Sequence, residues 1–304
     1  MRNLKWSILI SIFTLFFSCV EVFSQSSIIS GIVVDENDQN QPIPFVHVYS
    51  LGNFGTTCNE KGFFRVKLDS RQNNKDSAIF SAIGFHEKKI SLAGLFSEDT
   101  LIIKLSKKDY QLNEVQITPL EETVVLGPDY ASGQLPLYFL SSIPFQIGIV
   151  IDVPFQAKLK SAHYYIKKTK YSKTPFRVRV YKYDTITNKP STEVTKRRVL
   201  GKLEKRKGWA KINLQDENIF VQKEKIFVAF EVVFMGDDYY HEMKLMREEL
   251  QVYGATLTNC IYDRNKLYYK CFIKNYETNE WNEYRFNQNN VDVSFPLIKI
   301  ELKK

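Results

Sequence analysis

Hydrophobic and polar positions alternate along most of the chain with the two-residue period of β-strands. Residues 30–68 read as four short strands separated by tight polar turns, and residues 59–62, Asn-Glu-Lys-Gly, form the clearest hairpin turn. In residues 45–49, one face of the expected strand carries Val46 and Val48, and the other carries Phe45, His47 and Tyr49. The pattern continues to about residue 118, which predicts a small antiparallel sandwich.

Several motifs in this region carry a resemblance to a known family. In chain order they are SGIVVDEN, QPIPFVHVYS, GTTCNEKGFFRVKL, FSAIGFHEKKISL, LIIKLSKK and LNEVQI, within residues 27–118. Together they resemble the carboxypeptidase regulatory-like domain, a transthyretin-like β-sandwich with Greek-key topology. The resemblance implies a non-catalytic module of the Gram-negative cell envelope, where such domains precede outer-membrane receptors or sit in other envelope proteins.

The second half also reads as strands, with the clearest at 145–153, 159–166 and 176–183. Residues 226–234 are apolar on both faces, which indicates a central strand that is covered on both sides. Residues 240–250 have the spacing of one short helix, and residues 281–286 and 291–302 read as the last two strands. We therefore expect an all-β protein with a second, jelly-roll-like sandwich. The expected division is a signal peptide at 1–24, the first sandwich at 25–118, a linker at 119–134 and the second sandwich at 135–304.

The N-terminus has the pattern of an export signal. Arg2 and Lys5 precede an apolar run at residues 8–17, and Ser24 offers a cleavage position before Gln25. A second interpretation is a lipobox at residues 16–19, which would make Cys19 a lipid-bearing first residue. The expected location is therefore the periplasm, the outer-membrane surface or the medium, with peripheral or lipid-anchored membrane association under the second interpretation.

Catalytic and metal-binding motifs are absent from the sequence. There is no HExxH, no Gly-x-Ser-x-Gly and no Ser-x-x-Lys. Of the four histidines, His47 and His163 sit within strand alternation and are expected to be ordinary half-buried or surface residues. A distributed site could still assemble, and His163 and Glu231, the acid on a strongly apolar strand, are its candidates. For Glu231, an edge position or a pair with a nearby basic residue is the simpler interpretation. We predict no catalytic residue, no metal and no cofactor.

Charge suggests the class of partner. The net charge is +8, and residues 158–182 contain nine Lys or Arg and no acid. An exported protein does not normally meet nucleic acid, so the expected partners are an envelope protein or an anionic glycan such as lipopolysaccharide. The outward positions of the 176–183 strand would form the ligand surface: Arg177, Arg179, Tyr181 and Tyr183. Outward lysines that only keep strand edges soluble are the alternative.

These observations favour a non-catalytic, exported binding protein of the cell envelope. The alternatives are a hydrolase with an accessory N-terminal domain, or a lipid-anchored structural subunit of an outer-membrane complex. Cys260 and Cys271 flank an expected hairpin around residues 263–266. If that hairpin forms, the two thiols face each other and can form a disulfide, whereas two small apolar strand residues are the other interpretation.

Overall fold

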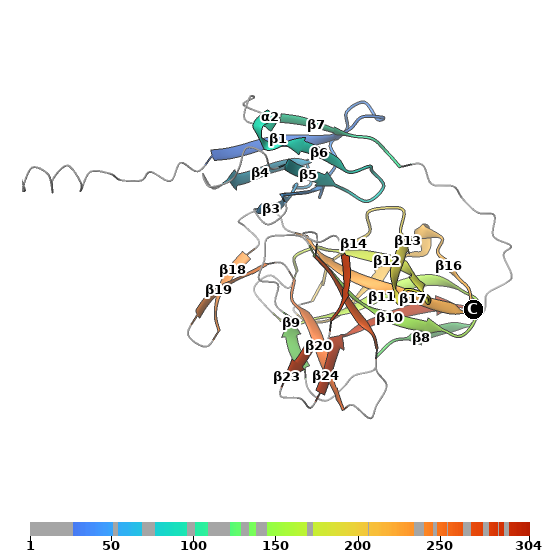
Figure 1. The fold of residues 1–304 in the computed structure, drawn as a ribbon. Coiled ribbons are helices and arrows are strands. Elements are labelled where there is room, and N and C mark those ends of the chain that lie inside the picture. The colour runs from blue at the N-terminus through green and yellow to red at the C-terminus, as the bar shows by residue number, and fades with distance from the viewer. Residues whose placement is uncertain are drawn as a thin grey trace, which may run out of the picture.

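A computed structural model shows an all-β protein in which two sandwiches pack against each other (Figure 1). This confirms the fold class predicted from the sequence. The structure describes residues 27–50, 54–68, 77–95, 101–108, 122–128, 134–137, 145–168, 173–205, 207–233, 240–245, 248–253, 255–263, 269–275, 280–284, 286–288 and 292–304. Residues 1–24, with the expected export signal and Cys19, lie outside these ranges.

The first sandwich consists of two small sheets. Sheet I has the order β4-β1-β7 and sheet II the order β3-β2-β5-β6. The elements are β1 (Ser27–Asp35), β2 (His47–Ser50), β3 (Phe54–Thr57), β4 (Phe63–Leu68), β5 (Ser77–Ser81), β6 (Lys88–Ser91), α2 (Leu92–Leu95) and β7 (Leu101–Leu105). Strands β1 and β7 are parallel and the other pairs are antiparallel.

The core of this sandwich lies between the two sheets. Phe64 of sheet I meets Phe80 of sheet II edge to face, with ring centroids 5.5 Å apart. Gly31 on β1 allows the parallel neighbour to approach, since a Cβ there would lie 2.5 Å from the Leu101 carbonyl oxygen. Val46 and Val48 enter this core, and His47 and Tyr49 lie on the opposite face of sheet II, as the alternation predicts.

The second sandwich also has two antiparallel sheets. Sheet III has the order β13-β12-β17-β10-β21-β22, with β14 on β12. Sheet IV has the order β23-β24-β20-β11-β25-β8, with β15 and β16 on β11 and β9 on β20. Sheet III contains β10 (Phe145–Val153), β12 (Phe176–Asp184), β13 (Lys189–Glu193), β14 (Leu200–Gly201), β17 (Glu224–Val232), β21 (Cys271–Asn275) and β22 (Glu280–Glu283). Sheet IV contains β8 (Thr123–Leu126), β9 (Gln134–Leu137), β11 (Ala157–Ile166), β15 (Gly208–Asn213), β16 (Phe220–Val221), β20 (Leu257–Asp263), β23 (Phe286–Gln288), β24 (Asp292–Pro296) and β25 (Ile298–Lys303). A 3₁₀ turn, η1 (Gln215–Glu217), and a separate pair, β18 (Tyr240–Leu245) and β19 (Glu248–Tyr253), complete the elements.

Aromatic side chains fix the two sheets of the second sandwich to each other. The Phe176 and Phe230 rings stack with centroids 4.6 Å apart, and Tyr164 of sheet IV packs edge to face on Phe176 at 5.2 Å. The Tyr164 hydroxyl donates to the Ala229 carbonyl of sheet III at 2.9 Å. This bond satisfies the one polar atom of a fully buried ring, so the tyrosine costs the core little.

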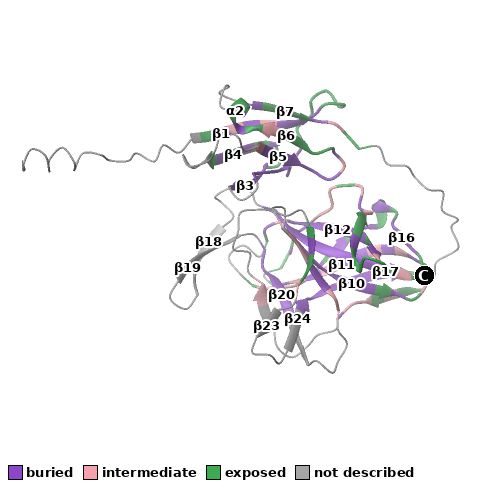
Figure 2. Ribbon diagram, viewed as in Figure 1, coloured by how far each residue is buried: buried purple, intermediate pink, exposed green. Residues whose placement is uncertain are grey.

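Sheet III is covered on both faces, as predicted for its strand β17. One face forms the sandwich core, and the other carries a second apolar cluster with Tyr181, Phe227 and Trp281 at its centre. The central strands β10, β12 and β17 are therefore buried along most of their length, whereas the edge strands β13 and β22 are largely exposed (Figure 2). The sandwiches thus form four sheet layers, in which the outer face of sheet II meets the outer face of sheet III.

Four sequence predictions need correction. Residues 240–245 and 248–250 lie in strands of the β18–β19 pair and not in a helix. Residues 123–126, assigned to a linker, form β8 at the edge of sheet IV. The last expected strand, 291–302, is two strands, and the expected 281–286 strand ends at Glu283. A sequence segment considered alone does not show which strand it will pair with, and strand pairing decides whether the segment is helical or extended.

The expected hairpin between Cys260 and Cys271 is also wrong. Cys260 lies in sheet IV, paired with Phe295 and Gln134, whereas Cys271 lies in sheet III, paired with Ile149. Cys271 is a free, buried thiol. The chain changes sheet between the two strands, which the local turn pattern does not indicate. No helix of the described residues is long and apolar enough to cross a membrane.

Candidate functional site

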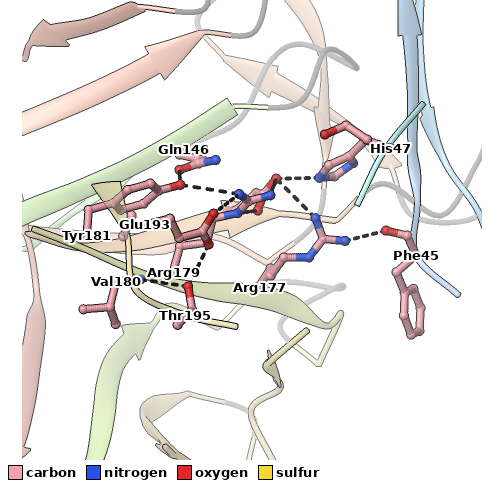
Figure 3. Close-up of polar contacts among 12 residues, drawn as sticks. Phe45, His47, Gln146, Arg177, Arg179, Val180, Tyr181, Glu193 and Thr195 are labelled. Atoms are coloured by element: carbon pink, nitrogen blue, oxygen red, sulfur yellow. Dashed lines mark hydrogen bonds and ion pairs between the residues drawn. The ribbon is translucent and has the colours of Figure 1, made fainter. Parts of the chain in front are cut away.

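Glu231 lies at the centre of a buried cluster of charged side chains at the junction of the two sandwiches. Figure 3 shows its partners His47, Arg177 and Arg179 pointing toward one another. It sits on β17, and Arg177 and Arg179 sit on the adjacent strand β12, in register with Glu231 and Ala229. The Arg179 Nε donates to one carboxylate oxygen, and its Nη2 lies 3.2 Å from the other. Arg177 Nη1 lies 3.4 Å from the same second oxygen, Oε1. Glu231 and Arg177 are both fully buried, at 0% exposure.

His47 of the first sandwich completes this cluster. Its Nε2 lies 2.6 Å from Glu231 Oε1, and its Nδ1 lies 3.0 Å from the Thr57 hydroxyl. A carboxylate only accepts hydrogen bonds, so Nε2 carries the proton and Nδ1 accepts from Thr57. The neutral imidazole is thereby held in one tautomer and one orientation.

Arginine side chains of the second sandwich also reach the backbone of the first. Arg177 Nη2 donates to the Phe45 carbonyl, and Arg198 Nη1 donates to the Pro44 carbonyl. Phe45 has a φ of +57°, a left-handed conformation that bulky residues rarely adopt. The two carbonyl groups of the turn at residues 44–45 thus accept hydrogen bonds from two arginines of the second sandwich. These bonds hold the two sandwiches in a fixed relative position.

The charges of this cluster balance. Arg179 Nη1 lies 3.0 Å from Glu193 Oε2, so two arginines face two carboxylates around a neutral histidine. The Tyr181 hydroxyl donates to Gln146 at 2.7 Å and extends the network along sheet III. Burial alone raises the pKa of the Glu231 carboxyl, but the two arginines and His47 outweigh it and hold that pKa well below 4.5. Burial, reinforced by both arginines, lowers the pKa of His47 to about 4, against the opposing effect of Glu231.

These pKa shifts predict acid-induced loss of stability. His47 has a lower pKa in the folded protein than its ordinary 6.5, so its protonation favours the open or unfolded chain as the pH falls from 6.5 to about 4. We expect the free energy of unfolding to fall by up to about 3 kcal/mol over this interval, at 1.36 kcal/mol per pKa unit. The Glu231 contribution has the same sign and is lost at lower pH.

Urea denaturation across this pH range, with wild type and His47→Gln, tests this. His163, whose pKa is also lowered, stays in both proteins and is the internal reference. The His47→Gln curve is expected to be flatter between pH 6.5 and 4. Parallel curves for the two proteins would show that His47 is not the titrating group.

Beside the cluster, a groove of about 430 Å³ follows the junction between the sandwiches. Its acidic lining residues, Asp35 and Asp38, lie 3.0 and 3.9 Å from the Lys107 ammonium. Arg198, which also lines it, lies over the Phe85 ring at 5.7 Å. The contact of Arg198 with Phe85 joins the two walls of the groove, whereas Asp35, Asp38 and Lys107 pair within the first sandwich.

A second polar constellation lies on the outer face of sheet IV. Ser161 Oγ lies 2.8 Å from His163 Nε2 and donates to Glu301 Oε2 at 2.9 Å. A catalytic triad needs the nucleophile and the acid on different ring nitrogens, but here His163 Nε2 faces both, with Glu301 at 3.4 Å. Glu301 is also paired with Lys160 and Lys211. The lysines and Ser161 lower the pKa of Glu301 to about 2, the contact with Lys211 contributing most. The group is therefore an ion-pair network and not a proton relay.

The first sandwich has the two facing sheets that the sequence motifs imply, but the parallel pairing of β1 with β7 departs from the antiparallel sandwich that the pattern predicted. Residues 29–117 match the CarboxypepD_reg-like domain. The match covers the N-terminal part of the chain and confirms the predicted resemblance. In this protein the CarboxypepD_reg-like domain supplies His47 and the Phe45 carbonyl to the buried cluster.

The solved structures that align along most of this chain have low sequence identity and low TM-scores. The cysteine protease and lectin-like domains of Cwp84, a surface layer associated protein of Clostridium difficile, align at 12% identity and a TM-score of 0.31. The alignment covers 92% of this chain and 59% of that one. BcpA, the major pilin subunit of Bacillus cereus, aligns in its D312A form at 10% identity and a TM-score of 0.20, over 90% of this chain and 69% of that one. Neither TM-score establishes a shared fold, and no curated protein matches the chain.

The expected exposure of Arg177, Arg179, Tyr181 and Tyr183 is wrong. All four point away from the core of the second sandwich, as the alternation predicts, but they are buried at 0, 7, 5 and 9% exposure. The CarboxypepD_reg-like domain covers the arginine end of β12, and Phe227, Phe272 and Trp281 pack on the tyrosines. Alternation indicates which face a side chain occupies but not what covers that face.

For Glu231, the predicted pairing with basic residues is confirmed, although β17 is a central strand and not an edge. His47, expected to be an ordinary half-buried or surface histidine, is instead a fully buried link between domains. The alternation predicted that His47 lies on the face opposite Val46 and Val48, but it could not predict that its partner is Glu231, 184 residues away in the sequence. Among the described residues, no group of three or more His, Cys, Asp or Glu has the arrangement of a metal site.

Proposed function

We propose that this protein is an exported, non-catalytic binding module of the cell envelope, built as two β-sandwiches held in one fixed arrangement. The observation that carries this proposal is the Glu231 cluster. It brings an acid and a base together, yet Glu231 and His47 are at 0% exposure and are hydrogen-bonded across the domain junction. An acid and base in this setting stabilise a docked interface, and the exposed sheet faces remain for binding.

Two further observations support the proposal. The export pattern at residues 1–24 and the CarboxypepD_reg-like match both fit an envelope protein. The basic character of the chain, with net charge +8, favours an anionic ligand such as an acidic glycan, with lipopolysaccharide among the candidates. A fixed domain arrangement lowers the entropy cost of presenting an extended binding surface.

A combined binding and turnover experiment tests this. Residues 25–304 are applied to a glycan array and, separately, incubated with peptide, ester and glycoside substrates. We expect selective retention of a subset of glycans and no turnover. Hydrolysis that disappears in Ser161→Ala would contradict the proposal, because it would assign catalysis to the Ser161–His163–Glu301 group.

A further inference from the structure

We propose that the outer face of sheet IV binds an anionic polysaccharide. This proposal rests on the binding function proposed above and gives that function a ligand class and a site. The second sandwich has two outer faces. That of sheet III is covered in part by the first sandwich, and its aromatic side chains around Trp281 pack on one another and are buried. That of sheet IV bears exposed residues on β8, β15 and β25 and partly exposed residues on β11. The Lys211 side chain is 56% exposed, and Val125 is 50% exposed.

Strand register aligns this face into rows. Trp209 is paired with Tyr165, and in the next row His163 lies between Lys211 and Lys299. In the third row Ser161 lies between Asn213 and Glu301. Residues in such rows lie on one side of the sheet, so they form one continuous platform of aromatic, cationic and hydrogen-bonding groups.

The aromatic end of the platform is suited to a sugar ring. Trp209 and Tyr165 are half-buried and meet edge to face, with centroids 5.3 Å apart and an interplanar angle of 83°. The Lys299 ammonium lies 5.2 Å from the Trp209 centroid. An amphipathic ring that is fixed at its edge offers apolar contact area at low entropy cost. The ammonium lies over the Trp209 ring, so a carboxylate or sulfate of a sugar bound at this ring would meet a positive charge.

Charge selects an anionic ligand. Lys160, Lys211, Lys299 and Lys303 occupy the platform, and Glu301 is the carboxylate among them. Lys160 and Lys211 both form ion pairs with Glu301, and the Glu301 side chain is 7% exposed. Four ammonium groups around one shared carboxylate leave a positive surface field that attracts anions over about a Debye length.

The platform favours a polysaccharide over a lipid surface. Membrane association through a sheet face needs several exposed apolar side chains that can insert. Among the described outward positions of this face, the exposed aliphatic residue is Val125, whereas the exposed Ile28, Phe63 and Ile102 gather on sheet I of the other domain. The exposed side-chain amide of Asn213 and the ammonium groups of the lysines instead match the hydroxyl and carboxylate groups of a sugar chain.

Isothermal titration of residues 25–304 with oligogalacturonate and dextran sulfate tests this site. The neutral probes are methyl-esterified oligogalacturonate and dextran. The test variants are Lys211→Gln/Lys299→Gln and Trp209→Ala, with Trp209→Phe to retain an aromatic ring. Lys182→Gln/Lys225→Gln is the matched control, since both of these lysines are exposed on sheet III. Thermal unfolding of each variant confirms that it is folded.

We expect at least one anionic probe to bind about tenfold or more tightly than its neutral counterpart, and binding to weaken as salt rises. The Lys211/Lys299 double variant and Trp209→Ala are each expected to raise the Kd about tenfold or more, while Trp209→Phe and the sheet III control stay within about threefold. Equal binding by the wild type and both test variants would overturn the site but leave the binding function standing. No binding of either anionic probe, or equally strong binding to anionic phosphatidylglycerol vesicles, would overturn the ligand class. The glycan array then decides the proposed function independently.

Discussion

Replacing Glu231 with glutamine is expected to lower the free energy of unfolding by about 3–5 kcal/mol. Glutamine keeps the size of the side chain but removes its charge. Arg177, at 0% exposure, and Arg179, at 7%, would then remain buried with one carboxylate fewer. Breaking a buried ion pair from one side costs this much because the remaining charge stays buried without the carboxylate that compensated its desolvation. His47 would also lose its charge-assisted hydrogen bond of 2.6 Å.

Urea denaturation with matched variants measures this effect. Glu204→Gln is the control, because Glu204 is 80% exposed and lies 3.8 Å from Lys202 in a surface ion pair. Such a pair contributes less than about 1 kcal/mol. Since Glu231 joins the domains, we also expect Glu231→Gln to separate the single unfolding transition into two. Equal, small effects of the two substitutions would refute the structural role of the cluster.

Replacing Gly148 with alanine is expected to destabilise the second sandwich by about 3 kcal/mol or more, at the upper end of overpacking costs. Gly148 lies on β10, paired with Ala229 of β17 and Phe272 of β21. A Cβ at this position would lie 2.2 Å from the Val228 carbonyl oxygen and 2.8 Å from the Phe227 ring. The first contact is with backbone in a central strand, which can move only if the pairing opens.

Gly94→Ala is the matched control for this prediction, since a Cβ at Gly94 meets nothing within 4 Å. We expect it to change stability by less than about 0.5 kcal/mol. Thermal unfolding of the two variants beside the wild type measures the difference. Similar melting temperatures for Gly148→Ala and Gly94→Ala would contradict the close approach of β10 and β17.

The local pattern was sufficient to predict the strands and the fold class, because alternation and apolar runs are properties of each segment. The strands at 145–153 and 176–183 and the central position of β17 all follow from it. Prediction failed where long-range pairing decides the outcome. The 240–250 segment has helical spacing, yet it pairs as β18 with β19, and strand pairing overrides a weak local preference.

The buried cluster could be predicted only in part. A carboxylate on a buried apolar strand must be paired, so the position of Glu231 predicted that it contacts a basic residue. Arg177 and Arg179 alternate on a neighbouring strand and were recognised as one surface. Their burial depends on the docking of a second domain, which no periodicity within one domain encodes. For this reason the burial of His47 and its contact with the second sandwich could not be predicted from the sequence.

A double-mutant cycle between His47 and Glu231 tests the central claim most directly, because the two residues belong to different sandwiches and touch only if those sandwiches dock as the structure shows. The free energies of unfolding are measured for wild type, His47→Ala, Glu231→Gln and the double variant at pH 7.5. We predict a coupling energy of about 1–3 kcal/mol. Additivity of the two single effects within about 0.5 kcal/mol would contradict the buried link between the domains.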